Sequence, residues 1–475
     1  MNGALDYLKK MEREAPGDPG LQFELATAYR KIADVQGGAT ANLGDIRAAL
    51  GNFETAERLL RKVLAARPGD GAAILELVRV LSQQGRTHHH MGDIKQALGD
   101  FRRASEEAAP LLQGKDTVEV RTELGSLLGV MAQAQRDSGD ARAALETAQR
   151  GVDVLESALR DAPDRVPTRD QLSAALSSLA MSKARARDVN GAVDGARRSV
   201  DLLEVMRPAR AQDPGFQRSL MEAYGALADL LGNPSLPSLG DRAGAEAAYR
   251  QAVALAEALV SADPNNRLAQ ADLAIGLTRL AAVLPEEKNA EAIVTYDRAF
   301  EAFRAVSTAD PNNINTRMNM AFALFVRGER KFDGGAMAGA LKDFRAGREV
   351  CRAILARKPG ELNTERVLIR GLSSEAKALS AAGQNSAALA VAREALAVAD
   401  YRNPGRSKYF DGILHARAYD ILVAVSPPPD ACAWAKRSLD TWNAVRNDPG
   451  FNVTVERERN LAVQAAARCP STARP

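Results

Sequence analysis

Histidines and cysteines are the side chains of this sequence best suited to chemistry, and three of the four histidines stand together as His88-His89-His90. Imidazole is a common metal ligand, so a metal site is one interpretation of this run. Consecutive residues of a helix, however, point about 100° apart, so three neighbours do not converge on one ion. No cysteine lies nearby in the sequence. We therefore expect the run to be the solvated end of a helix, with no metal and no cofactor.

Cys432 and Cys469 form a second candidate pair. Cys432 lies near the start of one expected helix and Cys469 at the end of the next, with the turn 447–450 between them. Antiparallel packing of the two helices would bring the thiols together as a disulfide, which would place the chain in an oxidising compartment and leave Cys351 as the free thiol. The alternative is that both residues are ordinary small apolar side chains.

Motifs of the common catalytic and nucleotide-binding sites are missing. The sequence contains no GxGxxG, GxxxxGK[ST], CxxC, HExxH or GxSxG segment, and neither kinase tripeptide, His-Arg-Asp or Asp-Phe-Gly. The 63 basic and 60 acidic residues are interspersed rather than gathered into a basic stripe. No run approaches the roughly 18 apolar residues that span a bilayer. We therefore expect no catalysis, no nucleic-acid partner and no membrane contact by this chain.

The elements that position these side chains are repeated. Gly139 is followed five, twelve and twenty-four residues later by Ala144, Gly151 and Pro163. The same spacing of small residues and proline starts at Gly44, Gly240 and Gly335. Self-similarity of this kind predicts a helical repeat array rather than several globular domains.

This order of small residues resembles the tetratricopeptide repeat (TPR), in which a Leu-small pair marks the first helix of a hairpin (helix A) and a proline follows the second (helix B). Leu124-Gly125 is such a pair. Each helix has seven residues more than in the usual repeat of about 34, and seven residues make about two helical turns, so the apolar face stays in register. The resulting period is 48, the separation of Gly335 and Gly383. The resemblance implies an all-α, right-handed, TPR-like α-α superhelix.

The periodicity predicts three parts. Residues 1–19 hold the helix of an incomplete repeat, 20–446 hold nine lengthened hairpins, and 447–475 hold a capping helix and tail. The hairpin near 165–213 departs from the spacing. Aromatic residues make up only 5% of the chain, and alanine is abundant. This composition favours close packing through small residues and argues against a large aromatic-lined ligand cavity.

The concave face of helices A is the general binding surface of the TPR family, and the resemblance implies a protein or peptide partner there. Carried over from the Leu-small register, the candidate contact residues are Arg30, Arg79, Ser82, Ser126, Ser177, Thr278, Arg370 and Ser373. A solvated helix face would explain these residues equally well. The Lys/Asn pairs of the two-carboxylate clamp found in chaperone-binding TPRs are not found.

The two ends of the chain resemble a more particular family. The segments ALDYL (4–8), LQFELATAY (21–29), DVQG (34–37), ANLGD (41–45), CAW (432–434) and RSLDTW (437–442) are similar to the C-terminal TPR region of transmembrane serine/threonine protein kinases common in acidobacteria and related soil bacteria. In that family a cytoplasmic kinase and a membrane span precede an array outside the cytoplasm. Neither part is in this chain, so no kinase residue is carried over. The resemblance implies the sensor or docking region of a bacterial kinase, extracytoplasmic or periplasmic in location. The alternative is a stand-alone cytoplasmic adaptor.

Overall fold

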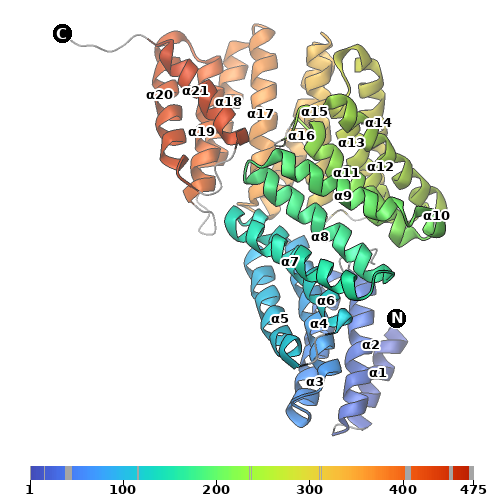
Figure 1. Ribbon diagram of the computed structural model, residues 1–475. Coiled ribbons are helices and arrows are strands. Elements are labelled where there is room, and N and C mark those ends of the chain that lie inside the picture. Colours follow the sequence, from blue (N-terminus) through green and yellow to red (C-terminus); the bar gives the residue numbers. More distant parts are fainter. Residues whose placement is uncertain are drawn as a thin grey trace. The chain divides into compact units, whose positions relative to one another are not determined.

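The computed structural model describes residues 2–14, 17–37, 45–114, 117–234, 236, 238–309, 311, 313–401, 408–448 and 453–469. These residues form twenty-one α-helices and one short 3-10 helix, and no strand occurs among them (Figure 1). The fold is therefore the all-α helical-repeat class expected from the sequence. None of the helices in this part of the chain is long and apolar enough to cross a membrane.

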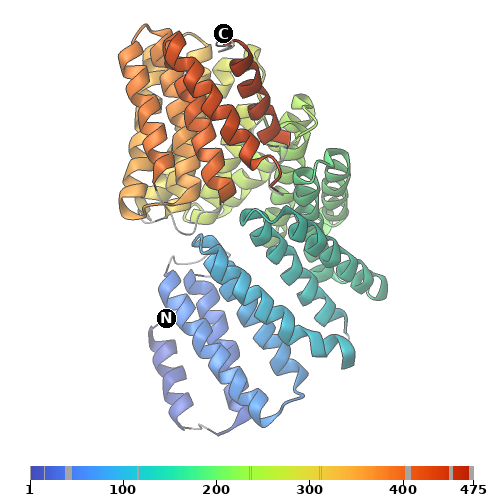
Figure 2. The same cartoon turned by 90° about the vertical axis from the view of Figure 1, so that its left-hand side faces the viewer.

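The chain divides into two compact units, Met1–Leu227 and Ala228–Pro475. The helices of the first unit are α1 (Asn2–Glu14), α2 (Pro19–Gly37), α3 (Ile46–Ala66), α4 (Gly71–His90), α5 (Ile94–Gly114), α6 (Val118–Asp137), α7 (Ala141–Asp161), α8 (Val166–Arg185), α9 (Val189–Glu204), α10 (Arg207–Arg210) and α11 (Pro214–Gly232), the last of which continues past the division. They pack as the antiparallel hairpins α2/α3, α4/α5, α6/α7 and α8/α9, which lie side by side in chain order (Figure 2).

The second unit repeats this arrangement. Its helices are α12 (Arg242–Ala262), α13 (Arg267–Val283), the 3-10 helix η1 (Glu286–Lys288), α14 (Asn289–Ala309), α15 (Ile314–Asp333), α16 (Met337–Arg357), α17 (Leu362–Ala381), α18 (Asn385–Asp400), α19 (Lys408–Val425), α20 (Pro428–Val445) and α21 (Val453–Ala467). The hairpins are α13/α14, α15/α16, α17/α18 and α19/α20. Each helix A also packs on the next helix A, as α13 does on α15 and α15 on α17. The helices A therefore share one face of the unit. The boundaries predicted after residues 19 and 446 stay predictions.

Glycines of the repeat spacing mark the turns between helices A and B. Gly139, Gly240 and Gly335 have φ angles of 92°, 80° and 79°, in the left-handed region that a Cβ disfavours. An aspartate follows two of them and caps the next helix; Asp140 Oδ1, for example, accepts from the Ala143 amide at 3.0 Å. Gly44, the first glycine of the spacing, lies outside the described residues.

The irregular fourth hairpin keeps the turn without the glycine. Arg187 stands 48 residues after Gly139 and has a φ of 74°. The following Asp188 still caps α9, accepting from the Gly191 amide at 2.9 Å. The backbone repeat is therefore maintained where the sequence spacing fails.

Small residues lie where helices approach closely. A Cβ added to Gly125 on α6 would lie 2.3 Å from Leu155 Cγ on α7. In the second unit, a Cβ at Gly347 on α16 or Gly371 on α17 would lie 2.7 or 2.2 Å from the ring of Phe325. Two glycines thus make room for one buried aromatic ring of α15.

Candidate functional site

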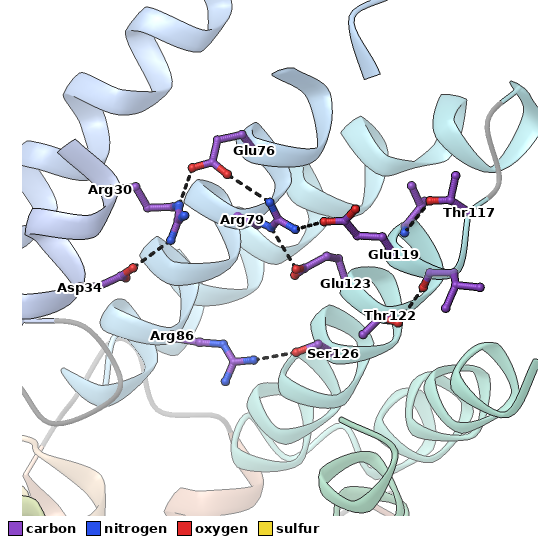
Figure 3. Close-up of polar contacts among 12 residues, drawn as sticks. Arg30, Asp34, Glu76, Arg79, Arg86, Thr117, Glu119, Thr122, Glu123 and Ser126 are labelled. Atoms are coloured by element: carbon purple, nitrogen blue, oxygen red, sulfur yellow. Dashed lines mark hydrogen bonds and ion pairs between the residues drawn. The ribbon is translucent and has the colours of Figure 1, made fainter. Parts of the chain in front are cut away.

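A buried carboxylate links the first two helices A of the first unit (Figure 3). Arg30 on α2 donates through Nε to Glu76 Oε1 on α4 at 2.6 Å, and through Nη1 to Asp34 Oδ2 at 3.0 Å. Glu76 is only 3% exposed. Burial raises the pKa of Asp34, against the opposing effect of the Arg30 charge. The Arg30 guanidinium is therefore held by carboxylates of the protein itself.

Arg79 extends this network to the third helix A. Its Nη1 lies 3.4 Å from Glu76 Oε2, and its Nη2 and Nε donate to Glu119 and Glu123 on α6 at 2.7 and 2.9 Å (Figure 3). The Arg79 guanidinium is thus surrounded by three carboxylates, of which Glu76 is buried and Glu119 and Glu123 are more exposed to solvent. The two arginines predicted to contact a partner in this unit are brought together by Glu76, and the network joins α2, α4 and α6.

The serines predicted from the same register have different surroundings. Ser126 Oγ accepts from Arg86 Nη2 at 3.1 Å (Figure 3), and Ser177 shares a hydrogen bond of 3.0 Å with Ser199 on helix B of its own hairpin. Ser82 on α4 and Ser373 on α17 are half-buried. A binding role for these residues stays a prediction.

The histidine run differs from the expected solvated helix end. His88 Nδ1 lies 2.6 Å from Asp100 Oδ2 on α5, and His89 Nε2 lies 2.8 Å from Asp137 Oδ2 on α6. Their side chains are 23% and 14% exposed. The hydrogen bond with Asp100 raises the pKa of His88. His88 and His89 therefore each pair with a carboxylate of another helix, and no group of three or more possible metal ligands occurs in the described part of the chain.

The C-terminal cysteines are joined in the structure. Cys432 on α20 and Cys469, just after α21, form a disulfide with their Cα atoms 5.6 Å apart. Cys351 is buried and free, and burial raises the pKa of its thiol to about 12. Residues 449 and 450 of the expected turn lie outside the described residues. Oxidation of the pair in the natural protein stays a prediction.

The second unit contains a cavity of about 850 Å³ lined by α13, α14, α15 and α17 and by residues that follow α11. Its apolar lining includes Ile275, Tyr296, Phe303, Phe322, Val326 and Val367. A cavity of this size differs from the close packing expected for this unit, although only Phe322 of its three aromatic residues is half-buried and Tyr296 and Phe303 are each 1% exposed. Few aromatic residues are present in the chain, but three of them lie around this one space.

Two of the predicted contact residues, Thr278 and Arg370, line this cavity. Thr278 is 4% exposed and donates through Oγ1 to Ala274 O at 2.8 Å. Arg370 donates through Nη2 to Glu329 at 3.1 Å, and its guanidinium carbon lies 5.1 Å from the centre of the Phe322 ring. The ring and the carboxylate thus fix this arginine on the cavity wall.

Arg330 is a third element of the wall. Its Nη2 donates to the carbonyl oxygens of Ala281, Ala282 and Leu284. These carbonyls belong to the C-terminal end of α13, where backbone acceptors lack helical partners and a cation is favoured. Arg330 therefore caps the C-terminal end of α13, a neighbouring helix A.

A buried polar network lies behind Arg279. Arg279 Nη1 is 3.0 Å from Asp229 Oδ2, and the opposite oxygen of Asp229 accepts from Asn233 Nδ2 at 2.6 Å and from the Tyr249 hydroxyl. Asp229 is 4% exposed and Tyr249 is fully buried. Burial raises the pKa of Tyr249, and the Asp229 charge adds to this effect. Asn233 and Arg279 reach the cavity from this network.

Reasoning from the Leu-small register missed Phe322, the half-buried aromatic residue of the cavity lining. Phe322 stands 48 residues before Arg370 and therefore occupies the same position of helix A. The pair that precedes it is Met320-Ala321 rather than Leu-small. The period of 48 was the signal that could have found it.

A tetratricopeptide repeat family model matches residues 47–87, which comprise most of α3 and α4. Similar solved structures include a Rap protein complexed with competence and sporulation factor (14% identity, 84% of this chain and 96% of that chain, TM-score 0.44). Others are human IFIT1 with m7Gppp-AAAA (17%, 84% and 78%, 0.40) and a thermophilic TPR protein of Thermus thermophilus (18%, 52% and 98%, 0.30). The search of curated proteins found no match. The family match and the helical hairpins together support a TPR repeat protein.

Proposed function

We propose that this TPR repeat protein is a non-enzymatic scaffold that binds a peptide segment of a partner protein in the cavity of its second unit. The observation that carries the proposal is the cavity itself, which has apolar and polar lining residues from α13, α14, α15 and α17. Its volume of about 850 Å³ lies within the range of roughly 300–1,000 Å³ typical of ligand sites.

The lining suits a peptide. Asn319 on α15 is half-buried, lines the same cavity and carries both a donor and an acceptor, the combination that pairs with a backbone N–H and C=O. In the first unit, by contrast, Arg30 and Arg79 on the helix A face are occupied by Glu76, Glu119 and Glu123. The second unit therefore offers the better binding surface.

The partner class can be tested with a phage-displayed library of random twelve-residue peptides, selected on the purified chain. Affinities of the selected peptides would be measured by fluorescence anisotropy for the wild type, Phe322→Asp and Ser126→Asp. Ser126 stands two residues after Leu124 on α6, the position equivalent to Phe322, and serves as the matched control because it lies in the first unit and does not line the cavity. We expect Phe322→Asp to weaken binding at least about tenfold, because it places a charge in the apolar lining.

Ser126→Asp should change the affinity by less than about twofold, as expected for a substitution that does not touch the bound peptide. Failure to select any peptide, or equal binding by Phe322→Asp, would refute the cavity as the peptide site. Far-UV circular dichroism of both variants would establish that they are folded.

The wider context that we propose is the sensor or docking region of a bacterial serine/threonine kinase. The likeness of the segments at the two ends of the chain supports it, and the disulfide is compatible with a location outside the cytoplasm. A stand-alone cytoplasmic adaptor is the alternative. Sequencing the genomic DNA upstream of the Met1 codon separates them, because an in-frame kinase and apolar span support the first and a stop codon supports the second.

A further inference from the structure

We infer that the peptide bound in this cavity presents a carboxylate beside an apolar residue, and that Arg279, positioned by the buried Asp229–Tyr249–Asn233 network, receives the carboxylate. The inference rests on the proposed peptide-binding function. It commits the site to one ligand chemistry, which the charges of the cavity wall define.

The wall carries an excess of donors. Arg279, Arg330 and Arg370 are half-buried, whereas Glu329 is the one half-buried carboxylate among the described lining residues. Each guanidinium has five N–H donors and no acceptor. Glu329 is engaged by Arg370 and also accepts from Ser374 Oγ at 2.7 Å. A ligand that supplies acceptors complements such a wall better than one that supplies donors.

Arg279 is the arginine of this wall best placed to bind an anion. Arg330 donates to the end of α13, and Arg370 pairs with Glu329 and stacks on Phe322. Arg279 meets Asp229 through Nη1, and 42% of its side chain is exposed. Its remaining N–H groups can therefore serve a carboxylate in the cavity, which a planar guanidinium binds through two parallel hydrogen bonds.

The network behind Arg279 fixes its position. Asp229 receives hydrogen bonds from Tyr249 and Asn233 on one oxygen and contacts Arg279 through the other. Because the carboxylate is buried and held from two sides, it keeps the guanidinium in one place. Less side-chain freedom is then lost when a ligand binds. Tyr249 acts through Asp229 and is a positioning residue.

The rim limits how acidic the ligand can be. Glu286 and Asp333 line the cavity and are exposed, and Arg242 is the one exposed cation of the described lining. Two rim carboxylates repel a strongly acidic segment, whereas a single carboxylate reaches the arginine wall between them. We therefore expect one carboxylate next to a residue such as Leu or Phe, and no benefit from further acidic residues.

Four peptide libraries test the ligand chemistry. Three carry a fixed central Leu followed by Glu, Gln or Lys and have an amidated C-terminus; the fourth ends in Leu with a free terminal carboxylate. We expect enrichment from the Glu library or from the free-carboxylate library, and the difference between them identifies the source of the carboxylate. Equal or better enrichment from the Gln or Lys libraries would overturn the inference while leaving peptide binding intact. Enrichment from none would contradict the proposed function itself.

Variants test the positioning role, using the best Glu peptide and its Gln counterpart in anisotropy measurements. Arg279→Lys should weaken the Glu peptide about tenfold, because a bidentate contact becomes a single one, and change the Gln peptide by less than about twofold. Tyr249→Phe should weaken the Glu peptide about threefold through the loss of one hydrogen bond in the network.

Tyr224→Phe is the matched control, since Tyr224 of the first unit also donates to a carboxylate, that of Glu204 at 2.7 Å. It should leave both affinities unchanged. Equal weakening of the Glu and Gln peptides by Tyr249→Phe would reduce its role to general stability and overturn the positioning argument.

Discussion

The last complete hairpin contains a carboxylate whose protonation should couple its stability to pH. Asp420 on α19 is half-buried against α20, where Ser438 Oγ donates to it at 2.5 Å and Trp442 Nε1 at 3.1 Å. Burial raises the pKa of Asp420 to about 6 from an ordinary value of 3.8, although the two hydrogen bonds oppose this rise. Glu458 adds to the rise and Arg417 opposes it.

The direction in which stability changes with pH follows from the difference between the pKa of Asp420 in the folded chain and its ordinary value. Between pH 3.8 and about 6 the folded chain binds more protons at this site than the unfolded chain does, so stability falls as pH rises through that window. A difference of about two pH units corresponds to about 3 kcal/mol. Because the side chain is half-buried, screening by solvent reduces the expected loss to about 2 kcal/mol.

The measurement is urea unfolding of the oxidised protein between pH 4 and 7.5, for wild type and Asp420→Asn. The two tryptophans of the chain, Trp434 and Trp442, both lie on α20, so their fluorescence reports on this hairpin. The asparagine lacks the charge but also loses one acceptor, which lowers its stability by about 1–3 kcal/mol at every pH. The variant should therefore gain about 2 kcal/mol relative to wild type as pH rises from 4 to 7.

The difference between the two stability curves carries the test, because other carboxylates change in both proteins alike. Asp440→Asn, at an exposed position of α20, controls for the loss of one surface charge. A difference that stays flat from pH 4 to 7 would show that Asp420 ionises freely in the folded protein, and the account of its burial would be refuted.

Three further predictions follow from the packing. Gly371→Ala should lower the free energy of unfolding by about 1–3 kcal/mol, measured by urea titration, because its Cβ would lie 2.2 Å from the buried Phe325 ring; unchanged stability would contradict that contact. Arg187→Gly should raise stability by up to about 1 kcal/mol by relieving the left-handed backbone, whereas Gly139→Ala at the equivalent turn should lower it by a similar amount, and effects of the opposite sign would disprove the equivalence of the turns. Thiol titration of the denatured, unreduced protein should find one free thiol, that of Cys351, if the disulfide forms in the natural protein, whereas three would exclude it.

Features that depend on a few neighbouring residues could be predicted from the sequence. The turn at Gly139 is an example, since a left-handed backbone and an aspartate cap leave their signature within a few residues. The period of 48 then predicts the same turn at other positions. At Arg187 the period holds while the residue type does not, which shows that backbone geometry is maintained by packing of the adjoining helices as well as by the local residue.

Whether the predicted contact residues already pair with other side chains of the protein could not be predicted in this way. Arg30 and Arg79 were assigned to the binding face because of their register on helix A, but their partners Glu76 and Glu119 lie on other helices, 46 and 40 residues away in sequence. Pairing at such distances depends on how side chains bend between neighbouring helices. Register thus locates a face, but it does not determine which charges on that face remain available to a ligand.

One position of helix A shows how a repeat of nearly constant backbone produces different surfaces. Two residues after the leucine of the Leu-small pair, or after its equivalent, stand Arg79 on α4, Ser126 on α6, Phe322 on α15 and Arg370 on α17. On α4 and α6 these side chains pair with neighbouring helices and extend the polar network. On α15 and α17 an aromatic ring and a guanidinium stack on each other and line a cavity. The proposed binding surface would therefore arise where the residue at a repeated position departs from the polar type found on α4, α6 and α17, and Phe322 is that departure in the second unit.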